Sequence, residues 1–265
     1  MHPTLFEVAG FRVSSFGLFL LAAFAAGVYN LMRGAQREGL DANEALDLAL
    51  YAIIGGILGA RAVYVAAHYG QYAAEPVRIL QIWQDGGLVF YGALAGGLIV
   101  SHFTARRWGL GRFADLAAPA VAIGYAVAMV GALLAGMFNG GETDAPWAVE
   151  IAGVARHPTQ IYLLAAAIGI YRVLGAVRRV RPRPGQVFLT FVFLLGLTRF
   201  VVEFFLDREL APAVWGPFTL GQFAHGTVAI LALLLLVARG GIAAQAMPPE
   251  PSPPSDGLEP AREDP

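Results

Sequence analysis

The sequence predicts an all-α membrane protein, a polytopic bundle of about seven transmembrane helices with a short amphipathic interfacial segment. Composition is the first reason: of the 265 residues, 57% are hydrophobic and only 14% are charged, and the mean hydropathy of +0.60 is far above that of a soluble domain. The second reason is that apolar runs long enough to cross a bilayer alternate with short polar loops. We therefore expect residues 1–244 to form one transmembrane helical domain.

Each expected span follows from the length of an apolar run, since a helix needs roughly 20 mainly apolar residues to cross a membrane. The first run lacks the basic region and the cleavage site of a signal peptide, so we expect it to be retained as a span. Residues 75–85 form a short amphipathic piece that we expect to lie in the membrane interface. The expected spans are residues 13–32, 45–69, 86–104, 116–138, 157–177, 186–206 and 218–238.

Arginines predict the orientation, because positive charge gathers on the cytoplasmic side of a membrane protein. They follow the first, third, fifth and seventh spans, so these ends are expected in the cytoplasm. The N-terminus and the loop 139–156 then face the outside, and the C-terminus faces the cytoplasm. The arginines that give this orientation are Arg33, Arg37, Arg106, Arg107, Arg112, Arg178, Arg179, Arg181, Arg183 and Arg239.

Composition also excludes several kinds of chemistry. The chain has no cysteine, so a disulfide, a thiolate metal site and a cysteine nucleophile of its own are unavailable. Its histidines are scattered without metal-binding spacing, and no basic tract indicates a nucleic-acid partner. We expect no cofactor and no metal. Residues 245–265 are rich in proline and charge, and we interpret them as a disordered cytoplasmic tail.

Small residues recur at helical spacing inside two of the spans, as Gly55 with Gly59 and Gly92 with Gly96. In a membrane, such residues let helices approach closely. We interpret them as packing positions.

Charged residues inside spans need a reason, because they are costly there unless they are paired or reach water. Arg61 in the second span is either a structural cation or an anion-binding one. Arg199 and Glu203 lie four residues apart on one helical face of the sixth span. They form either an internal salt bridge or, with Arg199 turned to a cavity, a phosphate-binding site.

Polar residues also gather where the chain leaves one span and enters the next. Asn139 and Glu142 follow the fourth span, and His157, Gln160 and Tyr162 begin the fifth. These side chains are either satisfied polar groups at the interface or members of one convergent site at the membrane mouth.

Several motifs, taken in order, carry a resemblance to a known family. They are GGILGARAVYV, a tryptophan followed by DGGLVFYGALAGG, then FNGGETDAPW, RHPTQIY, TRFVVEFF and finally LGQ. In this order they resemble the prolipoprotein diacylglyceryl transferases, and the resemblance covers everything except the tail.

The resemblance implies a seven-span enzyme of the bacterial plasma (inner) membrane with its N-terminus outside. It implies transfer of a diacylglyceryl group from phosphatidylglycerol to the lipobox cysteine thiol in a prolipoprotein signal peptide, with glycerol phosphate released. The implied partners are phosphatidylglycerol, the prolipoprotein and membrane lipids. The residues implied as catalytic are His157, Tyr91 and Arg199, and those implied as substrate-binding are Arg61, Asn139, Glu142, Gln160, Tyr162 and Glu203.

The chain departs from the family pattern at several polar positions. Ala132 stands where the signature GRxGNFxNGE has its arginine, and Tyr91 stands where a histidine is common. Leu163, Leu195 and Phe16 replace an acid and two tyrosines. These departures motivate an alternative, a catalytically silent paralogue that binds phospholipid or a membrane partner. A small-solute carrier is a weaker alternative, because no internal repeat is evident.

Overall fold

The computed structural model describes residues 4–8, 11–73, 75–81, 89–151, 153–180, 182–209 and 211–240. The predicted tail, the second part of the predicted interfacial segment and the start of the third predicted span lie outside these residues. The first part of the interfacial segment contains a short 3-10 helix, η1 (Pro76–Leu80), which follows the short helix α3 (Tyr69–Tyr72).

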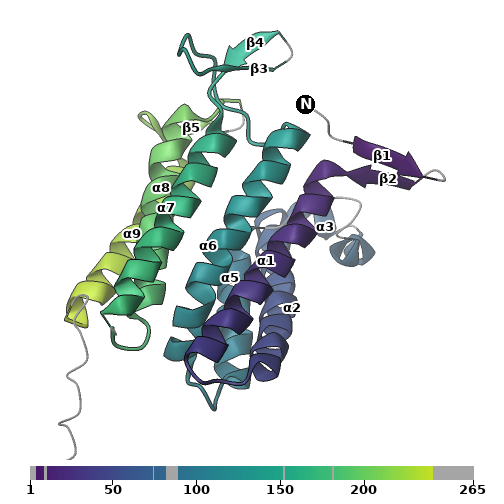
Figure 1. The fold of residues 1–265 in the computed structure, drawn as a ribbon. Helices are drawn as coiled ribbons and strands as arrows, with labels where there is room; N and C mark the ends of the chain where they lie inside the picture. Colours follow the sequence, from purple (N-terminus) through teal and green to yellow (C-terminus); the bar gives the residue numbers. More distant parts are fainter. Residues whose placement is uncertain are drawn as a thin grey trace, which may run out of the picture.

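Long apolar helices confirm the predicted all-α membrane class (Figure 1). Among the described residues, six helices are long and apolar enough to cross a membrane, and a shorter apolar helix of 15 residues, α5, accompanies them. The helices are α1 (Ser15–Arg37), α2 (Ala42–Ala67), α5 (Phe90–Thr104), α6 (Leu110–Ala135), α7 (Thr159–Arg179), α8 (Gln186–Val202), which continues as the 3-10 helix η2 (Glu203–Phe205), and α9 (Leu220–Ala238).

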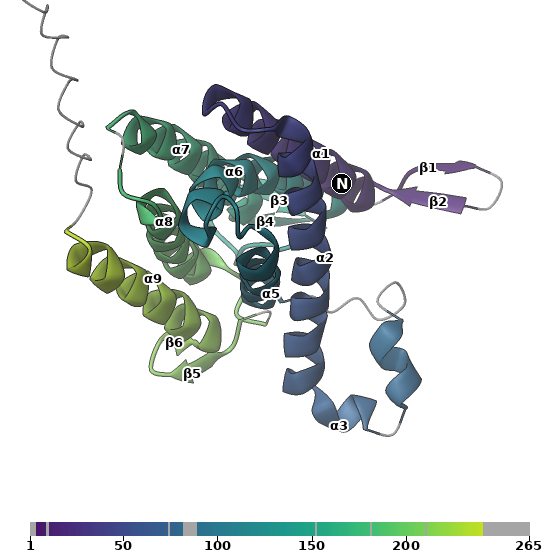
Figure 2. The ribbon, with the colours of Figure 1, turned by 90° about the horizontal axis from the view of Figure 1, so that it is seen from below.

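Helix α6 is the centre of the bundle. It packs on α1, α7 and α8, while α2 packs on α5 and α8 packs on α9. Figure 2, seen along the bundle, shows α6 among its neighbours and α9 at the periphery. On α6, Asp115 accepts hydrogen bonds from the backbone N–H groups of Gly185 (2.7 Å) and Phe188 (2.8 Å). This side chain therefore ties α6 to the first turn of α8, whose N–H groups have no partner within their own helix.

Short hairpins cover one end of the bundle, an element that the sequence reasoning did not predict. Each is an antiparallel pair of short strands, and all three lie at the end opposite the end of α9 (Figure 1). The pairs are β1 (Thr4–Val8) with β2 (Phe11–Ser14), β3 (Val149–Ile151) with β4 (Val154–Arg156), and β5 (Ala213–Trp215) with β6 (Phe218–Thr219).

The end with the hairpins is the one predicted to face the outside. The connections between α1 and α2, α5 and α6, and α7 and α8 lie together at the other end, which is the end predicted to be cytoplasmic (Figure 1). One predicted boundary needs correction: α6 begins at Leu110, six residues before the predicted start of the fourth span. Arg112 and Asp115 are polar residues in its first turns, and the predicted span began only after them because it was placed by its apolar residues.

The glycines of α2 and α5 confirm the packing interpretation. A Cβ on Gly59 would lie 2.4 Å from the Gly92 carbonyl oxygen, and one on Gly96 would lie 2.3 Å from the Gly55 carbonyl oxygen. Since backbone oxygens cannot move aside as side chains can, glycine is what allows the two helices to touch.

Replacement of Gly59 by alanine tests this contact. The added Cβ clashes with backbone, so we expect Gly59→Ala to lower the stability by about 1–3 kcal/mol despite the better helix propensity of alanine. Thermal unfolding in detergent measures it. The matched control is Gly169→Ala on α7, where a Cβ meets nothing within 4 Å. Equal melting temperatures for the two variants contradict the packing role.

A salt bridge ties the β3–β4 hairpin to the end of η2. Arg156 in β4 donates to the carboxylate of Asp207 and to the Gly140 carbonyl oxygen, the latter at 3.2 Å. The Glu209 N–H, which donates to the carboxylate at 3.0 Å, and Arg156 hold the pKa of Asp207 below its usual range. The carboxylate therefore stays ionised and keeps the hairpin attached under mildly acidic conditions.

The pH dependence of this tie has a definite sign. Because the pKa of Asp207 is lowered in the folded protein, its stabilisation is present above the unfolded pKa of about 4 and is lost as the pH falls through the lowered value. We expect Asp207→Asn to melt below wild type at pH 7, with a difference that shrinks below pH about 4. Asp144→Asn, an exposed carboxylate in the loop that carries the β3–β4 hairpin, is the control. A difference that does not change with pH contradicts the assignment.

Candidate functional site

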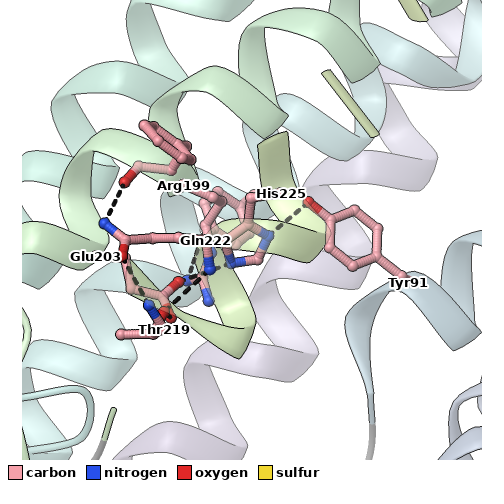
Figure 3. A network of polar contacts seen from close by, with 8 residues as sticks. Tyr91, Arg199, Glu203, Thr219, Gln222 and His225 are labelled. Atoms are coloured by element: carbon pink, nitrogen blue, oxygen red, sulfur yellow. Dashed lines mark hydrogen bonds and ion pairs between the residues drawn. The ribbon is translucent and has the colours of Figure 1, made fainter. Parts of the chain in front are cut away.

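A buried carboxylate lies at the hairpin end of the bundle, where α8 becomes η2. Glu203 is 8% exposed, and both of its oxygens are hydrogen-bonded. Oε1 accepts from the hydroxyl of Thr219 at 2.6 Å, and Oε2 lies 3.0 Å from Nε2 of His225 (Figure 3). A carboxylate removed from water needs such partners, because burying an unpaired charge is very unfavourable.

The first turn of α9 is shaped around this carboxylate. Thr219 and Gln222 form a capping box, with the Gln222 N–H donating to the Thr219 hydroxyl at 3.0 Å and the Thr219 N–H donating to the Gln222 side chain at 2.9 Å. A Cβ on Gly221 would lie 2.0 Å from Oε1 of Glu203. A side chain at position 221 would therefore push the carboxylate out of this position, and the positive end of the helix dipole favours the negative charge beside it.

His225 connects the carboxylate to a tyrosine on another helix. Its Nδ1 lies 2.8 Å from the hydroxyl of Tyr91 on α5, and the two side chains face one another in Figure 3. Because Nε2 faces an ionised carboxylate, it carries the hydrogen, and Nδ1 is left to accept the Tyr91 proton. The result is a chain of hydrogen bonds from Tyr91 through His225 to Glu203.

Arg199 lies one turn before Glu203, but the two are not paired. The guanidinium donates to the hydroxyl of Tyr125 on α6 at 3.3 Å, and no carboxylate of the described residues lies within ion-pair distance of it. The internal salt bridge considered from the sequence is therefore wrong, because Glu203 takes Thr219 and His225 instead. A guanidinium carries five N–H donors, and this is the one hydrogen bond that Arg199 makes to another described residue.

Arg199 and Glu203 line the same small cavity. Its volume is about 20 Å³, which is room for about one water molecule. A larger polar group enters only when the lining residues move apart. The lining residues are Phe138, Leu163, Arg199, Val202, Glu203 and Leu206.

A second polar cluster lies at the mouth, where the chain enters α7. Gln160 is 1% exposed and donates to the Met137 carbonyl oxygen and to the Asn139 side chain, the latter at 3.3 Å. Its own side-chain oxygen is buried and has no hydrogen-bond partner among the described residues. Nδ1 of His157 lies 3.1 Å from the Tyr162 hydroxyl. The structure therefore brings Asn139, His157, Gln160 and Tyr162 together.

The two clusters meet on the short segment 203–206. Phe205 packs its ring against His157 at 5.1 Å and against Tyr162 at 5.8 Å, and its carbonyl accepts from the Gly141 N–H at 2.9 Å. Glu203 begins the same segment. A shift of this segment therefore moves the buried carboxylate and the mouth cluster together.

Two predicted site residues lie elsewhere. Arg61 is buried and donates to the carbonyl oxygens of Ile79 (2.8 Å) and Arg78 (2.7 Å), with its guanidinium 5.1 Å from the ring centre of Tyr72. It is not among the residues that line the Arg199 cavity. Glu142 has an exposed side chain, and only its backbone is paired, with Arg156. The structure brings neither residue to the two clusters.

The departures from the family pattern lie together in space. Ala132 and Leu163 form one buried apolar cluster with Met129, and Phe16 packs against it. Leu195 is buried in the neighbouring apolar cluster. The resemblance implies polar residues at positions 16, 132, 163 and 195, and all four are apolar in this chain. The polar side chains Arg199, Glu203, His225 and Tyr91 lie beside this apolar group.

Sequence reasoning missed the roles of Thr219, Gly221 and His225. The capping-box pattern Thr219-x-x-Gln222 is visible in the sequence and marks the start of α9. His225 follows Gln222 by three residues and so lies on the same helical face. These two signals together place a histidine above the first turn of the last span.

Comparisons with known proteins agree with the motifs. The family model for prolipoprotein diacylglyceryl transferase matches residues 3–238. The chain is 31% identical over 248 residues to the phosphatidylglycerol–prolipoprotein diacylglyceryl transferase of Geobacter sulfurreducens, covering 89% of this chain and 95% of the relative. The enzyme of the same name from Chromohalobacter salexigens is 32% identical over 247 residues, with 89% and 92% covered. The chain therefore belongs to the prolipoprotein diacylglyceryl transferase family.

Proposed function

We propose that this protein transfers a diacylglyceryl group from phosphatidylglycerol to the cysteine thiol of a prolipoprotein lipobox. The names of its relatives state phosphatidylglycerol and prolipoprotein as their substrates. The observation that carries the proposal for this chain is Arg199, an arginine inside a span whose described hydrogen bond goes to a neutral hydroxyl. Such a cation is costly in a membrane unless it is paired or reaches water, and a bound anion would supply the pair.

The reaction places charge where Arg199 lies. The thiol sulfur attacks the glyceryl carbon that carries the phosphate ester, the C–O bond breaks, and glycerol phosphate leaves with an additional negative charge. Fixed donors that meet this charge stabilise the transition state more than the ground state. The planar fork of an arginine suits the phosphate oxygens.

The mouth cluster supports recognition of the headgroup. The buried side-chain oxygen of Gln160 is an unsatisfied acceptor, and it suits a hydroxyl donor such as that of a glycerol headgroup. Asn139 and Gln160 then orient the headgroup, while His157 and Tyr162 border it. Arg61 holds the segment 76–81 through its carbonyls, so the phosphate is assigned to Arg199 alone.

We further propose that the hairpin end faces the outside of the inner membrane, since the signal peptide of a prolipoprotein reaches the enzyme there. The natural absence of cysteine allows a direct test. We expect Glu150→Cys in β3 to react with a membrane-impermeant maleimide in intact cells, and Arg179→Cys at the end of α7 to react only after lysis. The reverse labelling contradicts this orientation.

The activity itself is tested with purified protein, phosphatidylglycerol vesicles and a lipobox peptide. We expect the diacylglyceryl thioether, detected by mass spectrometry, and a loss of roughly a hundredfold to a thousandfold in Arg199→Ala, because a donor to the developing charge is removed. Arg172→Ala, an exposed arginine on α7, is the matched control. Lipid binding without thioether, where the Geobacter sulfurreducens relative gives product, favours the silent paralogue instead.

A further inference from the structure

His225 is a buried imidazole with a partner on each ring nitrogen. It belongs neither to the proposed phosphate contact of Arg199 nor to the proposed headgroup contacts of the mouth cluster. We infer that His225 acts through Tyr91: it positions the phenol hydroxyl and receives its proton when the substrate thiol is deprotonated. This inference rests on the proposed function. It assigns the origin of the nucleophile's charge.

The geometry is that of a hydroxyl, a base and an orienting carboxylate. Tyr91 is 2.8 Å from Nδ1, and Glu203 is 3.0 Å from Nε2. The side chains of His225 and Glu203 are 10% and 9% exposed, so the imidazole exchanges its proton with Tyr91 more readily than with bulk water. An arrangement of this kind activates a hydroxyl or thiol in many unrelated proteins.

Glu203 is itself held rigidly. Thr219 donates to one of its oxygens, and Gly221 leaves the room that the carboxylate fills. A fixed carboxylate keeps the hydrogen on Nε2 and so keeps Nδ1 free to accept. It also stabilises the imidazolium that forms when the proton arrives.

The thiol proton moves in two linked transfers, through Tyr91 to His225. The S–H proton of the substrate passes to the Tyr91 oxygen while the Tyr91 proton passes to Nδ1 of His225, so the phenol is neutral before and after. The sulfur electron pair forms the bond to the glyceryl carbon, and the C–O pair leaves with glycerol phosphate. His225 is then a cation beside Glu203, and it returns the proton to water once the product has left.

The surroundings of His225 place the base near the phosphate-binding cation. Its charged and titratable neighbours in the described part of the chain come from several elements. Tyr91 on α5 and Glu203 in η2 contact it, while Arg199 on α8 and Tyr125 on α6 lie within electrostatic reach of Tyr91. The proton acceptor and the guanidinium therefore face the same region from different helices.

A pH–rate profile of His225→Gln tests the inference, because glutamine retains hydrogen bonding but cannot accept a proton. In wild type we expect kcat/KM to rise with pH and level off below the thiol pKa, because the enzyme itself accepts the thiol proton. In the variant we expect a loss of roughly 10²- to 10⁴-fold at neutral pH and a rise that continues toward the thiol pKa of about 8.5. His102→Gln, a histidine in the last turn of α5, is the matched control.

Tyr91→Phe is the second variant, and it decides the matter if His225→Gln does not fold. It removes only the hydroxyl and leaves the pair of His225 and Glu203, so we expect a comparable loss with the melting temperature little changed. Wild type that forms no thioether overturns the proposed function, and the inference with it. Active wild type together with an unchanged rate and pH profile in either folded variant overturns the inference alone.

Discussion

The buried carboxylate of Glu203 is the constraint on which the structure at the hairpin end of the bundle depends. Breaking a buried charge pair by removing one partner costs about 3–5 kcal/mol, so the local structure has to supply those partners reliably. Helix α8 gives way to η2 at this residue, α9 begins with a hydroxyl directed at it, and Gly221 removes the Cβ that would collide with it. The start of the last span is thus shaped by one side chain of the span before it.

The partners of Glu203 also determine which partner Arg199 has. Two opposite charges four residues apart on a helix normally satisfy each other. Here the carboxylate is already satisfied by Thr219 and His225, so the guanidinium is left with the neutral hydroxyl of Tyr125. Arg199 is thus an arginine of a span that has no carboxylate partner among the described residues, and it lines a small cavity together with Glu203.

The apolar cluster beside this site explains how the chain departs from the family pattern without unpaired charges. Ala132, Leu163 and Phe16 contact one group of buried side chains, so an arginine returned at position 132 alone would find no acid at position 163. Replacing the whole group by apolar residues avoids that penalty. The polar chemistry is then concentrated on the α8–α9 side, with Tyr91 reaching it from α5.

The sequence predicted the bundle well, because the length and apolarity of a span are local properties, and glycine packing follows from local spacing.

The site was predicted only in part. Arg199 and Glu203 were found from their position in a span, but their pairing was wrong because the competing partners, Thr219 and His225, lie on the next helix. Tyr91 and His225 are 134 residues apart, and nothing local relates them. The sequence left Arg61 open between a structural and an anion-binding role, because a buried arginine that donates to backbone carbonyls looks the same in a sequence as one that binds a phosphate. In a membrane bundle, the identity of a polar residue says that it needs a partner, and only the packing of distant helices decides which partner it has.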